Sequence, residues 1–236
     1  RKKATALSGS PMIFIRKLWA IVWKDLLSEL RTKEMILSMC LFSFLVLIIF
    51  SFALGTEVMN LKTIVPGILW VVFIFSGLMG LGRAFGAERD KGTLPGLLLC
   101  PLSPWGIYLA KVVGTFIFTA IMEILTLSIF IILFNLNLLP VLLPIGLIIF
   151  LGTLGFSAIG TLFSAMSAAT KSRDTILSIL VFPITVPMLI AAVKATETIL
   201  AGKAVAEVYP SLKILIAFDL IYLLIAYLPF TFIIEE

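Results

Sequence analysis

The sequence predicts an all-α polytopic membrane protein with six transmembrane helices. Hydrophobic residues make up 61% of the chain and charged residues only 13%, whereas soluble domains carry about 25% charged residues. The apolar residues form continuous runs close to the roughly 20 residues that a bilayer-spanning helix needs. Strands of a membrane barrel would alternate instead, so these runs indicate helices. The expected spans are residues 36–54, 64–82, 105–134, 140–166, 174–193 and 212–234.

Two segments precede the first span. Residues 1–11 (RKKATALSGSP) differ in composition from the rest of the chain, and we expect them to be a remnant of a leader or an expression tag. A single permease domain would then cover residues 12–236. Within residues 13–31, apolar side chains recur at helical spacing and basic ones fall on the opposite face. This pattern predicts an amphipathic helix lying on membrane lipid at the inner surface. A simple basic anchor for topology is the alternative.

Basic residues predict the orientation of the spans. Fourteen Lys and Arg residues flank one side, or eleven without residues 1–11, against four on the other. The side richer in Lys and Arg faces the cytoplasm, so both termini are expected there. The basic residues are scattered between apolar runs, which argues against nucleic acid as a partner. The chain has no histidine and only two cysteines, so we predict no metal site, no cofactor and no disulfide framework.

The segment 87–111 between the second and third spans is the most informative loop. Four consecutive charged residues, 88–91, must remain in water, and Gly92 permits a turn. Thr93 suits the cap of a short apolar helix that Pro101 would end. Such an element is suited to transmit force from a cytoplasmic partner. The residues alone equally allow an ordinary loop with amphipathic ends.

Three motifs resemble a known family. The pattern E-x-x-x-G-T-L-x-x-L-L-x-x-P-L, followed by Lys111, resembles the conserved loop of ABC-2-type transporter permeases, which forms a coupling helix on the ATPase subunit. IVPGILWV (64–71) and the segment 151–190 resemble the haem exporter protein B (CcmB) family of cytochrome c maturation permeases. Gly82 and Pro95 stand where relatives often carry acids, so neither is assigned a role. The predicted ATPase-coupling residues are Glu88, Arg89, Gly92, Thr93, Leu94, Leu97, Leu98, Pro101 and Leu102.

The resemblance implies a membrane subunit for haem transport and cytochrome c biogenesis in the bacterial inner membrane. Its implied partners are an ABC ATPase subunit, a second copy of the chain, a haem-handling membrane protein and a periplasmic haem chaperone. The chain lacks the phosphate-binding motif G-x-x-x-x-G-K-[ST]. We therefore expect it to be non-catalytic, with ATP hydrolysis in a separate chain. The work could be haem export or release of the haem-loaded chaperone.

Three other functions compete with this hypothesis. A generic ABC-2-type exporter of a drug, lipid or glycan would share the fold and the coupling loop. A proton-coupled carrier would use the intramembrane acids Glu123 and Asp219, but convincing inverted repeats are absent from the sequence. An assembly scaffold would move nothing. The two acids could also lie near a membrane boundary, or be neutral and hydrogen-bonded to Ser or Thr.

Two features of the later spans suggest packing and bending. Small residues on the fourth span, including Gly160 and Ser164, predict close contact with another helix, of this chain or of a second copy. Pro183 and Pro187 in the fifth span each remove a backbone hydrogen bond, so we expect a kink. The kink could be a static bend, a moving hinge or the descent into a re-entrant segment.

Overall fold

The computed structural model describes residues 11–54, 61–81, 102–135, 138–168 and 173–226, together with Gly92, Gly96 and Cys100. Within these ranges the chain is helical and contains no strand. The helices are α1 (Pro11–Thr32), α2 (Glu34–Leu54), α3 (Leu61–Leu81), α6 (Pro104–Leu133), the 3-10 turn η1 (Leu139–Val141), α7 (Leu142–Ala168), α8 (Arg173–Leu200), the 3-10 turn η2 (Val205–Glu207) and α9 (Tyr209–Ile225).

Five of the described helices (α2, α3, α6, α7 and α8) are long and apolar enough to cross a bilayer. They confirm the all-α polytopic fold, and their bounds lie within three residues of the first four expected spans, whereas α8 extends seven residues beyond the fifth. The sixth expected span, 212–234, is helical as far as Ile225, and its remainder lies outside the described residues. α6 has 30 residues and measures about 45 Å, longer than the roughly 30 Å hydrocarbon core.

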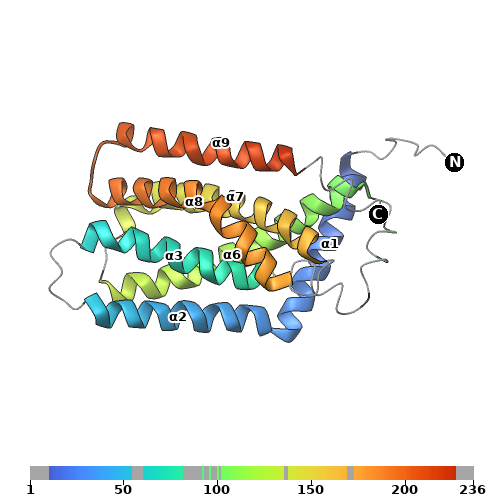
Figure 1. Cartoon of the computed structure of the whole chain (residues 1–236), viewed down its shortest axis with the longest axis horizontal. Coiled ribbons are helices and arrows are strands. Elements are labelled where there is room, and N and C mark those ends of the chain that lie inside the picture. Colours follow the sequence, from blue (N-terminus) through green and yellow to red (C-terminus); the bar gives the residue numbers. More distant parts are fainter. Residues whose placement is uncertain are drawn as a thin grey trace.

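The long helices lie side by side, and α1 runs across the end of the bundle where α2 and α6 begin (Figure 1). Residues 13–31 are helical, as predicted, within α1, and their place on the inner membrane surface stays a prediction. The apolar face of α1 packs on α6, with Ile21 and Val22 buried, while Trp19 and Trp23 on the other side are about half exposed. α7 contacts α3, α6, α8 and α9, and α6 contacts α1, α2, α3 and α7, so these two helices connect the rest of the bundle.

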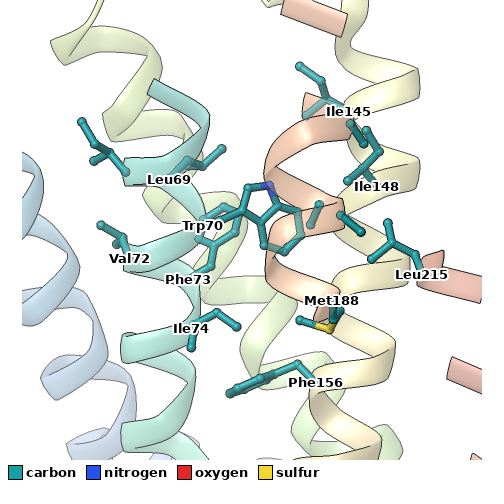
Figure 2. Close-up of a cluster of buried hydrophobic side chains, with 14 of the residues drawn as sticks. Leu69, Trp70, Val72, Phe73, Ile74, Ile145, Ile148, Phe156, Met188 and Leu215 are labelled. Atoms are coloured by element: carbon teal, nitrogen blue, oxygen red, sulfur yellow. The ribbon is translucent and has the colours of Figure 1, made fainter. Parts of the chain in front are cut away.

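The largest core cluster surrounds Trp70 of α3, whose side chain is 1% exposed. Figure 2 shows the indole ring lying between α3 and the helices that carry Ile148 and Met188. Its Nε1–H donates to Thr196 Oγ1 at 3.0 Å. This bond fixes α3 to α8 and gives the buried indole N–H the partner that it requires.

α8 passes through Pro183 and Pro187 and continues as one helix to Leu200. Figure 1 shows that it bends partway along its length. A re-entrant segment would interrupt the helix, and α8 shows no such break. The helix also continues beyond residue 193, where the apolar run ends.

Candidate functional site

Most of the predicted coupling residues lie outside the described residues: Glu88, Arg89, Thr93, Leu94, Leu97, Leu98 and Pro101. Gly92 is described, and it is exposed in a turn with φ +64°. This left-handed conformation suits glycine, because a Cβ would crowd the following carbonyl oxygen. Leu102 is half-buried and packs in a cluster shared by α1 and α6. The described part of the site therefore begins where the loop joins α6.

α6 begins at Pro104, two residues after Leu102. The side chain of Ser103 caps the helix by accepting a hydrogen bond from the Gly106 N–H at 3.2 Å, and Pro104 occupies the first turn. A Cβ on Gly106 would collide with the side chains of Leu102 and Phe14. The missing side chain at Gly106 thus lets the loop end and α1 close on the first turn of α6.

A buried ion pair links α1 to α6 two turns further along. Lys111 Nζ lies 2.8 Å from Asp25 Oδ2, and Lys111 is only 2% exposed. Asp25 also lies 3.1 Å from Lys24 Nζ, which is more exposed. Removing water from two opposite charges is unfavourable unless they stay paired in good geometry. This pair therefore holds α1 against α6 at a fixed register.

A second contact links α1 to α2. The carboxylate of Glu29 accepts hydrogen bonds from the backbone N–H groups of Met35 and Ile36, at 2.8 and 3.3 Å. These N–H groups belong to the first turn of α2, where helical donors lack partners within the helix. The connection between the helices turns at Lys33, with φ +56°. α1 is thus bonded to the starts of both α2 and α6.

Hydrogen bonds also join α6 to α7. Tyr108 donates to the Ala158 carbonyl at 2.9 Å, and Thr161 donates to Thr115 at 3.4 Å. Deeper in the bundle, Thr153 of α7 bonds to Glu123 of α6. Polar residues recur on α6 every four positions and therefore follow one face. They are Lys111, Thr115, Thr119 and Glu123.

The small residues of α7 pack within this chain. A Cβ on Gly160 would collide with Leu81 of α3, and the Ser164 hydroxyl donates to the Leu81 carbonyl at 2.8 Å. Thr161, next to Gly160 on α7, contacts Thr115 of α6 instead. Both contacts are therefore intramolecular. Whether Gly160, Ser164, Pro183 and Pro187 also serve a moving part stays a prediction.

Both intramembrane acids are buried inside the bundle, each 4% exposed. Asp219 of α9 lies against Gly155 of α7, where the absence of a side chain makes room for its carboxylate. Neither oxygen of Asp219 has a hydrogen-bond partner among the described residues. Glu123 and Asp219 thus reach α7 almost at the same level, near Thr153 and Gly155. In the part of the chain that the structure describes, no group of three or more Cys, Asp or Glu side chains could hold a metal ion.

Comparison with known proteins identifies the family. The family described as "CcmB protein" matches residues 16–234. The chain belongs to this family. It is similar to proteins named Heme exporter protein B: 31% identical to that of Haemophilus influenzae over 79% of this chain and 82% of the relative. Identity to the Escherichia coli K12 protein is 30% over 76% and 81%. For Pseudomonas aeruginosa, it is 29% over 67% and 70%.

In this CcmB family member, Lys111, Asp25 and Glu29 make contacts between helices that the sequence did not predict. Lys111 was matched only as the lysine that opens a helix, and its depth in α6 was not apparent. Asp25 and Glu29 were two acids on a basic helix, and their partners lie on other helices. A signal was present at Lys111, because a cation within an apolar run requires a counter-ion.

Proposed function

We propose that this chain is the membrane subunit of an ATP-driven complex for haem export in cytochrome c biogenesis. The match to the CcmB family over residues 16–234 carries the proposal, because it spans nearly the whole permease. The relatives' name, Heme exporter protein B, supports haem as the molecule concerned. The chain acts without catalysis of its own, and a separate ABC ATPase subunit supplies the energy.

The complex lies in the bacterial inner membrane, with both termini of this chain in the cytoplasm. The ATPase pushes on residues 88–102, and the push enters α6 through Leu102. α6 then moves α1 through Asp25 and α7 through Tyr108, whose contacts support this route. A second copy of the chain, a haem-handling membrane protein and a periplasmic haem chaperone complete the assembly. The output is haem export or release of the loaded chaperone.

Two glycines provide a matched test of the coupling segment. Gly92 and Gly202 have φ +64° and +70°, and a Cβ would meet nothing within 4 Å at either position. Gly92→Ala and Gly202→Ala therefore impose the same backbone cost, about 1–2 kcal/mol. Gly202 follows α8, at the end of the bundle away from α1. We expect G92A to reduce ATPase recruitment and cytochrome c maturation, and G202A to leave both near wild type.

The measurement is co-purification of the ATPase from cells, together with the yield of haem-bound c-type cytochrome in a host lacking its own haem exporter protein B. Equal losses in both variants would mean a general stability effect. Unchanged recruitment and maturation in G92A would remove the coupling role. If no ATPase co-purifies with the wild-type chain, the whole proposal fails.

The orientation is tested with the same positions. Gly92→Cys and Gly202→Cys are introduced singly into a chain in which Cys40 and Cys100 are replaced by serine. A membrane-impermeant thiol reagent applied to intact spheroplasts should label G202C only. Labelling of G92C from outside would place the coupling segment beyond the reach of any cytoplasmic ATPase.

A further inference from the structure

Glu123 occupies an unusual place for an acid. It is 4% exposed within α6, which is packed by α1, α2, α3 and α7. α7 carries no charged residue, and the only charged residues of α2 and α3 lie in their first turns, at Glu34 and Lys62. On α1, Asp25 pairs with Lys111, which lies twelve positions before Glu123, or about 18 Å along the helix. The ion pairs among the described residues join Lys24 and Lys111 to Asp25, and no cation of the described part of the bundle pairs with Glu123.

The other titratable groups near Glu123 are Cys40 and Asp219, and neither of them can carry a positive charge. Cys40 of α2 faces Met122, with the two sulfur atoms 3.7 Å apart. Asp219 reaches α7 at Gly155, two positions from Thr153, and hence on a different side of the helix. An ionised carboxylate at Glu123 would thus be a buried, uncompensated charge, which is costly in this environment.

The hydrogen-bond geometry at Thr153 supplies an independent argument. Thr153 Oγ1 lies 2.7 Å from the carbonyl oxygen of Ile149, one turn earlier on α7, and it also bonds to Glu123 Oε2. A hydroxyl carries one proton, whereas a carbonyl and a carboxylate only accept. Threonine in a helix commonly donates that proton to the carbonyl four residues before it. The contact with Glu123 then requires a second proton, and the carboxyl group is its source.

We propose that Glu123 is a proton-binding site in the interior of the bundle. The carboxyl group is neutral, its O–H donates to Thr153 Oγ1, and the Thr153 hydroxyl donates to the Ile149 carbonyl. The bound proton thereby links α6 to α7 through a continuous chain of hydrogen bonds. Loss of that proton would leave two acceptors facing one donor and weaken this link.

Infrared spectroscopy of the purified chain in lipid tests the proposal. At neutral pH, the wild-type spectrum minus that of Glu123→Gln should contain a carboxylic acid C=O stretching band, which shifts in D2O. Asp219→Asn is measured beside it, so that a band from the other buried acid is not mistaken for Glu123. A difference spectrum that contains carboxylate bands instead would show that Glu123 is ionised and overturn the proposal.

A second variant keeps the test independent of how well E123Q folds. Thr153→Val removes the acceptor of the acid proton, so the C=O band should move to higher frequency while its intensity remains. Thr153→Ser retains a hydroxyl and should leave the band near its wild-type position. A band that stays in place in T153V would show that the acid proton does not go to Thr153, and would overturn the assigned bond.

Discussion

α6 makes two buried polar contacts that differ in how they avoid an unpaired charge. Lys111, 2% exposed, meets the carboxylate of Asp25 on α1. Glu123, 4% exposed, has a threonine hydroxyl on α7 as its hydrogen-bond partner among the described residues. Burial is nearly equal, so burial does not explain the difference. The available partner does: a residue with a counter-ion can stay charged inside the protein, whereas one without it is best accommodated as a neutral group.

The two contacts also show that α6 is bound to its neighbours in different ways near its start and deeper in the bundle. Near its start, α6 is held by opposite charges to α1, the helix that crosses the end of the bundle (Figure 1). Deeper in the bundle, its polar contacts with α7 among the described residues are hydrogen bonds and not ion pairs. Breaking the ion pair leaves a charge behind, and breaking a hydrogen bond leaves only a dipole. We therefore expect larger effects at the α1 end.

The largest effect is expected for Lys111→Met. Methionine has a similar length but leaves the Asp25 carboxylate without its buried partner, and breaking such a pair costs about 3–5 kcal/mol. The side chain of Asp25 is 17% exposed, so partial solvation and Lys24 place the expected loss at the lower end. The measurement is the unfolding free energy of the chain in lipid or detergent.

The double variant Lys111→Met with Asp25→Asn is the control. Removing both charges should restore most of the lost stability, because the uncompensated carboxylate is gone. If the double variant is as unstable as the sum of the two single variants, the two residues do not interact. The ion pair would then contribute nothing to holding α1 on α6.

A smaller loss is expected for Glu29→Ala. The substitution leaves the N–H groups of Met35 and Ile36 without their side-chain acceptor, and losing a helix cap costs about 1 kcal/mol. Glu29→Gln keeps an acceptor oxygen and should recover part of the loss. Hydrogen exchange of the first turn of α2 is the direct readout. Unchanged exchange in E29A would show that the cap does not tie α1 to α2.

A feature of the fold or of the candidate site can be predicted from the sequence where the contacts that determine it are local. The ranges of the first four spans, the start of the fifth and the range of α1 follow from apolar run length and helical periodicity, which are local properties. α8 extends past residue 193, and there Thr196 accepts the Trp70 N–H, while Thr196 and Thr198 also donate to carbonyls one turn back. The apolar run ends near residue 193, so run length does not predict this extension, and the contact with α3 is not visible in the sequence.

In the candidate site, too, contacts between residues far apart in the sequence could not be predicted. The sequence allowed Glu123 to be neutral and bonded to a Ser or Thr, and Thr153 on the next helix is that partner. It did not identify Lys111 as buried, because Asp25 lies 86 positions earlier. Asp219 remains without a partner among the described residues, so neither pattern nor geometry assigns it a role. The predicted coupling role of residues 88–102 rests on resemblance alone.

The smallest effect is expected for Thr153→Val, which keeps the shape of the side chain and removes its hydroxyl. Hydrogen bonds between membrane helices contribute on average about 0.6 kcal/mol, and the neutral acid left behind carries no net charge. The loss in unfolding free energy should therefore be well below that of Lys111→Met. A loss as large as that of K111M would mean that Glu123 is left ionised and uncompensated. In that case Glu123, like Lys111, would be a buried charged group, and the two contacts of α6 would not differ in the way proposed here.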